Sequence, residues 1–375
     1  MDGPTRALFK AHLRPFVEHD LPERKTALRN AIGYLLRAQE QGKDAGMGSY
    51  HLLHGWGASY PETTGYAIPT LIRAGEHLAW QEPLDAALSA AAWLLSIQRT
   101  DGGWQGGRVG ENRRSIVFNT AQVIRGLLAA YALAKDDRFL DSASRAGRWI
   151  ASAQDTDGAW REHNFLGAAR VYDSYVDAPL LELFAITGDE VLKVAAERNL
   201  EWVLDQRRPN GWFDNCDNSM RHNNRPITHT IAYTLDGLLE CGERSNDDEF
   251  VRAATDGATV LLNKFIEAGT LNGRYDGDWR GTEHAIMTGC AQLAIVWSKL
   301  HDRTGATMYR DGLFRMTDRL MAVQQASMLG PLAAQGALPG SYPVWGRYEK
   351  FAFPNWGTKY FADALLCAER SALVQ

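Results

Sequence analysis

The chain repeats one helical unit six times along its length. The first helical stretch of each unit closes on a Gln, or once on a Lys, and a loop rich in Gly and aromatic residues follows it. A second helical pattern begins after every loop. Self-similarity at this period is typical of an array of helical hairpins, not of independent domains. The repeated residues are Gln39, Gln98, Gln154, Gln206, Lys264 and Gln324, at intervals of 59, 56, 52, 58 and 60 residues.

The two helices of a unit differ in character. The first is amphipathic, as at 84–98, 138–154 and 190–206, where charges alternate with apolar residues at three- and four-residue steps. The second carries fewer charges and more small residues, as at 118–134 and 228–242. We therefore predict an outer layer with one wet face and an inner layer that is buried on most sides.

Six such hairpins close naturally into a double ring, an all-α (α/α)6 toroid. An open solenoid is the alternative, but it would need polar capping repeats, and neither end of the chain shows one. No linker rich in Pro or Ser interrupts the repeats, so a single domain is expected over residues 25–375, preceded by an N-terminal extension at 1–24.

Closure of the ring would place all six loops at one end, which we call the mouth. Six inner-helix N-termini would point into it, each with unpaired N–H groups and roughly half a positive charge. Aromatic side chains of the loops add flat apolar surfaces that suit sugar rings or isoprenoid chains. We expect the mouth to bind an anionic ligand.

The composition narrows the classes of partner. A net charge of −5, without a run of Lys or Arg, does not support nucleic-acid binding. There is no signal-peptide pattern and no stretch of about 20 apolar residues, so we expect a cytoplasmic protein without a membrane span. No HExxH pattern occurs, and the Cys residues are widely spaced, so we expect buried thiols and neither a metal nor another cofactor. The four cysteines are Cys216, Cys241, Cys290 and Cys367.

Two helix starts carry candidate catalytic residues. Glu62 and Tyr66 are four residues apart at the first inner helix, so they share a helical face. Glu62 either complements the helix dipole or acts as a general acid or base. His229 and Tyr233 have the same spacing after Thr228, a predicted N-cap. A His at a positive helix end is kept neutral, which suits a base at pH 7, although a structural role for the pair is an equal alternative.

The loop at 271–279 supplies further candidates. The planar guanidinium of Arg274 could clamp a carboxylate or phosphate. Asp276 could join Glu62 as the carboxyl pair of a glycosidase, whereas turn formation alone would also explain the Gly and Asp residues here. Glu283 and His284 stand just before the fifth inner helix, without an assigned role.

The remaining candidates are aromatic, Asn or Tyr residues at loops and helix starts. Asn119 and Asn355 stand where either a helix cap or a ligand contact would be placed. Tyr172 and Tyr175 are expected on one helix face, with Asp173 and Asp177 on another, and one of these pairs should face the mouth. The full set of candidate substrate-binding residues is Trp56, Tyr60, Tyr66, Asn119, Trp160, Tyr172, Tyr175, Trp212, Arg274, Trp279, Tyr342, Trp345, Asn355 and Trp356.

The segments SIQRTDGGW, SAQDTDGAW and DQRRPNGW resemble the Gln-to-Trp repeats of the squalene cyclase and protein prenyltransferase superfamily. This resemblance covers most of the chain and implies a toroid of the terpenoid cyclase and polysaccharide lyase type. The sequence has no DxDD motif, through which class II terpenoid cyclases protonate their substrates. It also shows no counterpart of the Asp, Cys and His set that binds zinc in protein prenyltransferases.

A closer resemblance is to bacterial and archaeal proteins described as squalene cyclase-like or prenyltransferase-like. The shared motifs follow one another along nearly the whole chain: YPETTGY (60–66), FNTAQV (118–123), DGAW (157–160), ITHTIAY (227–233), TGCAQLAIVW (288–297), GSYPVWG (340–346) and PNWGTKYFADAL (354–365). The genes of this group often lie among surface-polysaccharide biosynthesis genes, which implies a carbohydrate substrate. The sequence departs from the group at Glu283 and His284.

Three functions follow as hypotheses. The leading one is an enzyme that acts on an acidic, uronate-containing glycan. A lyase or epimerase would use Arg274 to neutralise the carboxylate and His229 with Tyr233 to move protons, whereas a hydrolase would use Glu62 and Asp276. An isoprenoid cyclase or prenyltransferase-like enzyme is the second, because aromatic rings stabilise cations. A non-catalytic glycan-binding protein is the third.

Overall fold

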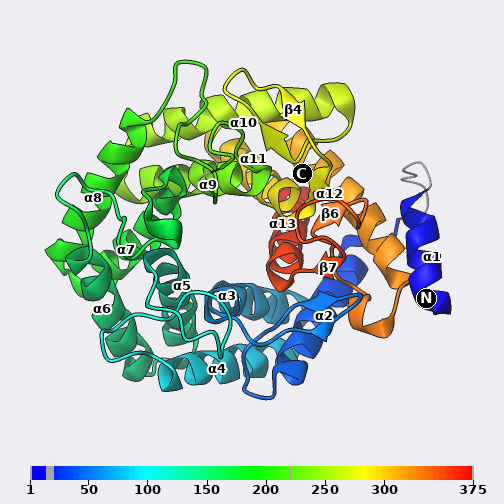
Figure 1. Ribbon diagram of the computed structural model, residues 1–375, viewed down its shortest axis with the longest axis horizontal. Helices are drawn as coiled ribbons and strands as arrows, with labels where there is room; N and C mark the ends of the chain where they lie inside the picture. The colour runs from blue at the N-terminus through cyan, green and yellow to red at the C-terminus, as the bar shows by residue number, and fades with distance from the viewer. Residues whose placement is uncertain (1, 14–20, 220, 374–375) are drawn as a thin grey trace.

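The computed structural model describes residues 2–13, 21–219 and 221–373 and confirms the (α/α)6 toroid (Figure 1). Helices alternate between an outer and an inner ring in chain order. The outer helices are α2 (Arg24–Gly42), α4 (Gln81–Ser96), α6 (Asp137–Ser152), α8 (Glu190–Asp205), α10 (Asp248–Ala268) and α12 (Thr307–Met328). The inner helices are α3 (Pro61–Leu78), α5 (Val117–Ala134), α7 (Ser174–Thr187), α9 (Thr228–Ser245), α11 (Met287–Thr304) and α13 (Asn355–Leu373).

Each inner helix packs against the next one around the ring, and the ring closes where α13 packs against α2 and α3. The inner helices are buried along most of their length, whereas the outer helices keep one exposed face. By length and composition α5 would suffice to cross a bilayer, but 67% of it is buried in the inner ring. That degree of burial is typical of a core helix.

The repeated Gln side chains join neighbouring units. The Nε2 of Gln39 donates to the carbonyl oxygens of Ala45 in its own loop and Ala86 in the next outer helix, both at 2.9 Å. Gln98 and Gln154 each donate the same two hydrogen bonds, one within their own loop and one to α6 or α8. Gln324 donates one of its bonds to Ala27 of α2, at 3.0 Å, and so links the last unit to the first. Gln206 bonds only within its own unit.

Threonines of the inner helices hold the loops in place through hydrogen bonds. The hydroxyls of Thr64, Thr120 and Thr358 accept hydrogen bonds from backbone N–H groups of their own loops, at 2.9, 3.0 and 3.1 Å. The inner helices α3 and α5 also pack closely against each other. A Cβ at Gly126 would lie 2.3 Å from the carbonyl oxygen of Gly65, so only glycine lets α3 and α5 approach so closely.

Short antiparallel strands connect the loops at the mouth. β1 (Tyr50–His51) pairs with β2 (Gly55–Trp56) and with β7 (Ala352–Phe353), which joins the first loop to the last. β5 (Ala285–Ile286) pairs with β6 (Ser341–Tyr342), and β3 (Arg274–Tyr275) with β4 (Gly281–Thr282). The short 3-10 helices are η1 (Phe165–Gly167), η2 (Val171–Asp173) and η3 (Leu332–Ala334).

The N-terminal extension contains α1 (Gly3–His12), which packs outside the ring. Its Phe9 ring stacks on Trp345, with ring centroids 5.8 Å apart, and the backbone N–H of Val344 donates to Nδ1 of His12. Residues 1 and 14–20 of the predicted extension lie outside the described residues.

One predicted helix start was wrong. Ile227, not Thr228, is the N-cap of α9, and the Thr228 hydroxyl donates instead to the carbonyl oxygen of Asn272. The third inner helix begins at Ser174, because residues 171–173 form η2.

Replacement of Gln324 by Ala should lower the free energy of unfolding by about 1–3 kcal/mol, because two buried hydrogen bonds, to Ala27 and Gly336, are lost. Urea unfolding would measure it. Gln81→Ala is the matched control: this exposed amide bonds only to Asp85 on its own helix, so the loss should stay within about 0.5 kcal/mol. Equal losses in the two variants would contradict the role assigned to Gln324.

Candidate active site

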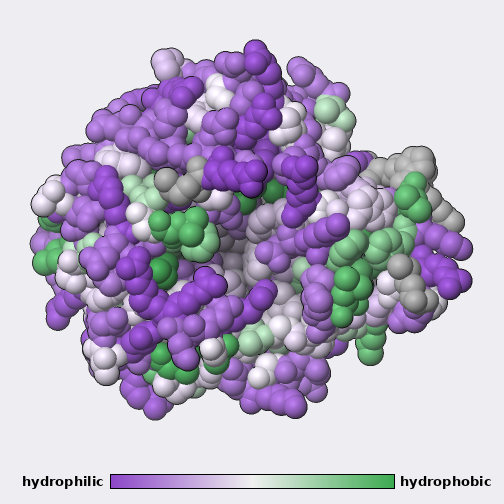
Figure 2. All heavy atoms as spheres, in the orientation of Figure 1, coloured by the Kyte–Doolittle hydropathy of each residue, from purple (hydrophilic) through white to green (hydrophobic). Residues whose placement is uncertain are grey.

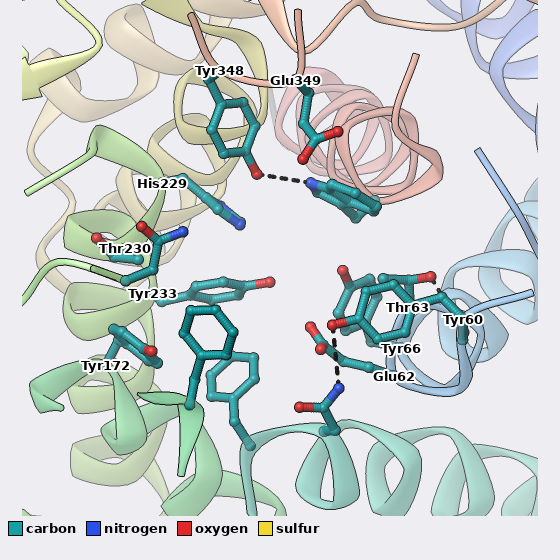
Figure 3. Close-up of a pocket in the computed structure, with 15 residues that line it drawn as sticks. Tyr60, Glu62, Thr63, Tyr66, Tyr172, His229, Thr230, Tyr233, Tyr348 and Glu349 are labelled. Atoms are coloured by element: carbon teal, nitrogen blue, oxygen red, sulfur yellow. Dashed lines mark hydrogen bonds between the residues drawn. The ribbon is translucent and has the colours of Figure 1, made fainter. Parts of the chain in front are cut away.

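A cavity of about 280 Å³ opens at the mouth of the ring. Figure 2 shows this face hollowed near its centre, with mostly hydrophilic side chains around the hollow. Aromatic rings form much of the cavity wall. The lining residues are Tyr60, Glu62, Thr63, Tyr66, Phe118, Asn119, Phe165, Tyr172, Asn218, His229, Thr230, Tyr233, Tyr348, Glu349 and Trp356 (Figure 3).

The polar groups of the cavity come from the first turns of the inner helices. Glu62 is the second residue of α3, Asn119 the third of α5, His229 the second of α9 and Trp356 the second of α13. Tyr172 lies in η2, just ahead of α7. Because these helices all start at the mouth, residues far apart in sequence meet around one cavity.

Glu62 is a buried acid. It is only 9% exposed, and burial raises the pKa of its carboxyl group to about 7, although a hydrogen bond with Tyr60 opposes this. The hydroxyl of Tyr60 also accepts a hydrogen bond from Nδ2 of Asn119, at 3.2 Å. At neutral pH a substantial fraction of Glu62 is therefore protonated, which is the state that a general acid needs.

His229 is a buried neutral base. Burial lowers its pKa to about 4, so the imidazole carries no charge at pH 7. Its Nδ1 lies 2.7 Å from Oε1 of Gln292, which can only accept, so Nδ1 carries the proton and Nε2 is left as an acceptor. The ring packs against Tyr233, with centroids 4.5 Å apart, and against Tyr348 at 5.7 Å.

The last loop contributes two residues that the sequence analysis missed. Tyr348 accepts a hydrogen bond from Nε1 of Trp356, at 3.0 Å, and stands beside Glu349. Figure 3 shows the carboxyl groups of Glu349 and Glu62 on different sides of the cavity. Burial raises the pKa of Glu349, and the guanidinium of Arg108 opposes the shift. No periodic signal marks this loop, so only the fold brings Glu349 to the site.

Phe118 is another missed residue, although it stands next to Asn119 in the FNTAQV segment. Its ring meets those of Tyr172 and Tyr233 edge-on, at 5.4 and 5.1 Å. Thr63, Phe165, Asn218 and Thr230 complete the residues that the sequence did not single out.

Arg274 and Asp276 lie outside the cavity lining. Nη1 of Arg274 donates to Oδ1 of the buried Asp217 at 3.0 Å and to the carbonyl oxygen of Arg225 at 2.7 Å. Asp276 accepts backbone hydrogen bonds from Asp278 and Arg280, which lower its pKa. The structure thus gives Arg274 a role in loop structure and Asp276 the role of a turn former, and neither of them meets Glu62.

Several aromatic candidates support the loops instead of lining the cavity. Nε1 of Trp160 donates to the carbonyl oxygen of Ile150, and Nε1 of Trp279 to that of Asn210. Trp212 is buried beneath the guanidinium of Arg208. The others in this class are Trp56, which packs on Tyr34 and Tyr50; Tyr342, which packs on His12; and Trp345, which stacks on Phe9.

Three further candidates take structural positions. The side-chain amide of Asn355 donates to the carbonyl oxygens of Met47 and Gly48, which joins the last inner helix to the first loop. Tyr175 lies below the cavity, while Tyr172 lines it, so the predicted pair is divided between two levels. Glu283 forms ion pairs with Arg347 and Arg274, and His284 is exposed.

The cavity contains acids and bases but no strong cation. None of its lining residues is Arg or Lys. Positive charges act on the lining residues from outside the cavity: Arg108 on Glu349, Arg113 on Tyr60 and Arg170 on Tyr172. Within residues 2–13, 21–219 and 221–373, no three His, Cys, Asp or Glu side chains form a cluster suited to a metal ion.

Sequence comparison supports the resemblance to squalene cyclases over part of the chain. The family model of the squalene-hopene cyclase C-terminal domain matches residues 1–170. The squalene–hopene cyclase of Zymomonas mobilis subsp. mobilis is 30% identical over 156 residues, which cover 37% of this chain and 20% of that protein. The chain thus matches a fifth of the length of this curated relative. The similarity to squalene cyclases is confirmed for this part of the chain.

Solved structures with the same fold extend over nearly the whole chain. The unsaturated glucuronyl hydrolase of Bacillus sp. GL1 has a TM-score of 0.72 at 14% identity, covering 93% of this chain and 97% of that one. An α-mannanase of Bacteroides thetaiotaomicron has a TM-score of 0.66 at 14% identity, covering 94% and 97%. At this level of identity the similarity establishes the toroidal fold.

The raised pKa of Glu62 should make the folded protein less stable at alkaline pH. Between the ordinary value of 4.5 and about 7, the folded state binds more protons than the unfolded state, so the free energy of unfolding falls as pH rises through this window. Glu62→Gln should remove a loss of up to about 3 kcal/mol at pH 8.

Urea unfolding of the wild type and Glu62→Gln at pH 5 and pH 8 would test this. Glu76→Gln, an exposed Glu on the same helix, is the control and should follow the wild type at both values. A constant difference between wild type and Glu62→Gln across this range would mean that Glu62 ionises normally.

Proposed function

We propose that the protein is a glycoside-active enzyme that hydrolyses a terminal sugar residue, with Glu62 as the general acid. The observation that carries this proposal is the placement of a buried carboxyl group, with a pKa of about 7, in an aromatic cavity that a second carboxyl group also lines. Hydrolysis of a glycosidic bond needs two such groups on either side of the bond.

The chemistry follows from their different environments. Protonated Glu62 gives its proton to the leaving oxygen as the glycosidic bond breaks. Glu349 then either removes a proton from the attacking water or itself attacks the anomeric carbon. Burial raises the pKa of both carboxyl groups, but the charge of Arg108 opposes the shift at Glu349, so Glu349 is the one whose ionised form a positive charge supports. Two carboxyl groups in unlike surroundings can thus take unlike roles.

The cavity favours a small substrate group. Its volume of about 280 Å³ is near the lower limit of small-molecule pockets, which is about 300 Å³. The site therefore suits a single terminal residue of a glycan. Aromatic rings such as Tyr172, Phe118 and Trp356 offer flat faces for the apolar side of a sugar ring, and Asn119 and Thr63 offer hydrogen bonds.

An acidic sugar is the preferred substrate class. The neighbouring structures include enzymes named for unsaturated glucuronyl groups, one of them specific for heparin. In this chain the mouth carries Arg108, which can pair with a carboxylate or sulfate outside the cavity, whereas Arg113 is already paired with Glu111 at 2.8 Å. A lyase or epimerase is the weaker alternative, because Arg274 is occupied by Asp217 and no cation inside the cavity neutralises a uronate carboxylate.

An isoprenoid cyclase is the second candidate function. The similarity of residues 1–170 to the squalene-hopene cyclase domain favours it, as does the aromatic cavity wall, because such rings stabilise carbocations. Glu62 would then be the proton donor in place of the missing acid motif. Incubation with squalene and with isoprenoid diphosphates, followed by mass spectrometry of cyclic products, tests this candidate.

On an acidic oligosaccharide that the wild type cleaves, Glu62→Gln should lower kcat at least about 100-fold with little change in KM. Proton donation is lost, but the shape of the side chain is kept. Glu349→Gln should act in the same way. Glu76→Gln is the control with normal activity. The measurement is release of the terminal sugar, read by mass spectrometry from a panel of saturated and unsaturated uronate oligosaccharides.

The products separate the alternatives. With the reaction run in heavy water, addition of water across the cleaved bond indicates a hydrolase. A new double bond in the product indicates a lyase, and deuterium uptake without cleavage indicates an epimerase. Binding without turnover, weakened by Glu62→Ala, would instead support a glycan-binding protein and count against the proposed reaction.

Arg108→Ala should raise KM several-fold for acidic oligosaccharides and leave KM unchanged for neutral ones of the same length, because one favourable charge pair at the mouth is lost. Arg138→Ala, which removes an exposed Arg on the outside of the ring, is the control. Equal effects on acidic and neutral substrates would argue against a charge-selective mouth.

A further inference from the structure

His229 lines the active-site cavity, but the proposed cleavage gives it no task. It is the second residue of α9 and only 8% exposed. Proton transfer in the proposed reaction belongs to Glu62 and Glu349, so the imidazole is available for another purpose. The contacts of its two ring nitrogens show what that purpose is.

Gln292 fixes the orientation of the imidazole. It is fully buried on α11, and its Oε1 lies 2.7 Å from Nδ1 of His229. Gly289, three residues earlier, lets α11 come this close to α9, because a Cβ there would lie 2.9 Å from the backbone nitrogen of His229. An amide oxygen can only accept a hydrogen bond, so the proton of the ring is on Nδ1.

The backbone that carries His229 is also held firmly. The N–H group of Thr228 donates to the carbonyl oxygen of Gly273 at 2.9 Å, and its hydroxyl donates to that of Asn272 at 2.6 Å. The rings of Tyr233 and Tyr348 pack against the imidazole. His229 therefore meets a ligand in a position that exists before binding, as a selective contact requires.

The second ring nitrogen faces the cavity. Figure 3 shows the His229 side chain directed from α9 into the space between Tyr348 and Tyr233. Among the residues that the structure describes, none donates a hydrogen bond to Nε2. The ring is neutral at pH 7, because burial lowers its pKa to about 4. Nε2 thus offers a lone pair that the protein itself does not use.

A neutral acceptor of this kind distinguishes between sugars. A hydroxyl group of a bound sugar can donate to Nε2, whereas a deoxy position places only C–H groups beside it. Because the bound sugar excludes water from the cavity, Nε2 would then remain without a donor, and a buried polar atom without a partner is costly. Sites built to bond a hydroxyl group reject analogues that lack it far more strongly than apolar pockets reject a missing methylene group.

We propose that His229 is a specificity-determining residue whose Nε2 accepts a hydrogen bond from one hydroxyl group of the terminal sugar. Gln292 is the positioning residue that keeps Nε2 free of a proton. The inference rests on the proposed function, because it needs a sugar in this cavity. His229 keeps its single proton on Nδ1 throughout the cycle, and the proton of the sugar hydroxyl stays on the sugar.

Nitrophenyl glycosides of the sugar that the wild type releases, with each of their monodeoxy and monofluoro analogues, provide the test. For one position the wild type should lose at least about tenfold in kcat/KM with the deoxy analogue, and this loss should largely disappear in His229→Phe. The fluoro analogue of that position should behave like the deoxy one, since fluorine cannot donate. Intrinsic differences in reactivity cancel, because both enzymes receive the same substrates.

Three further variants complete the test. His229→Leu repeats it if His229→Phe does not fold. Gln292→Leu removes the acceptor of Nδ1 and lets the ring proton move to Nε2, so the deoxy penalty should shrink and the fluoro analogue should gain relative to the deoxy one. His77→Phe, at the far end of α3 where His77 faces Glu369, is the control and should keep the wild-type pattern. The thermal midpoint of each variant checks its fold.

The outcomes distinguish the two levels of the argument. An active wild type whose deoxy penalties are the same in His229→Phe or His229→Leu overturns the inference and leaves the proposed function intact. So does an equal loss for parent and analogues, which would make His229 a catalytic or structural residue. A fluoro analogue accepted as well as the parent would show that Nε2 donates, and also overturns it. A folded wild type that cleaves no saccharide of the panel overturns the proposed function, and the inference with it.

Discussion

The structure depends on one hydrogen-bonding pattern, the side-chain amide that joins a loop to the next outer helix. Each amide donor of Gln39, Gln98, Gln154 and Gln324 bonds two carbonyl groups that belong to different units. Because a largely buried amide N–H group without an acceptor is costly, separation of the loop from the neighbouring helix is penalised. The bond made by Gln324 returns the last unit to the first, so the pattern joins four of the six neighbouring pairs of units, including the pair that closes the ring.

The active-site cavity follows from that closure. Inner helices that start at one end bring Glu62, Asn119, His229 and Trp356 together from four units. Burial then acts on the two titratable groups in opposite senses on the pKa scale, raising that of Glu62 and lowering that of His229. Both shifts favour the uncharged form, since the loss of water penalises charge of either sign. The result is a cavity with little fixed charge that can still exchange protons.

The two ends of the ring are lined by different kinds of side chain. At the mouth, aromatic rings and single polar groups leave space for a ligand. At the opposite end, charged side chains such as Lys299, Asp236 and Glu240 pair with one another at 2.6–2.7 Å. Helix C-termini leave carbonyl groups unpaired and favour cations nearby, which is consistent with Lys and Arg at this end. Tyr66, Tyr175, Tyr233 and Tyr360, which are all buried, lie between these two environments.

The sequence by itself determined the toroid, because the spacing of Gln and loop repeats and the contrast between wet and buried helices each report a local property. It also identified the residues of the first helical turns, such as Glu62 and His229, since position in a helix decides direction toward the mouth. Only the tertiary structure decided the partners. Glu349 joins Glu62 and Asp276 does not, because a loop side chain has no periodicity that predicts its direction. Arg274 likewise pairs with Asp217, 57 positions earlier, and that contact exists only once the loops pack together.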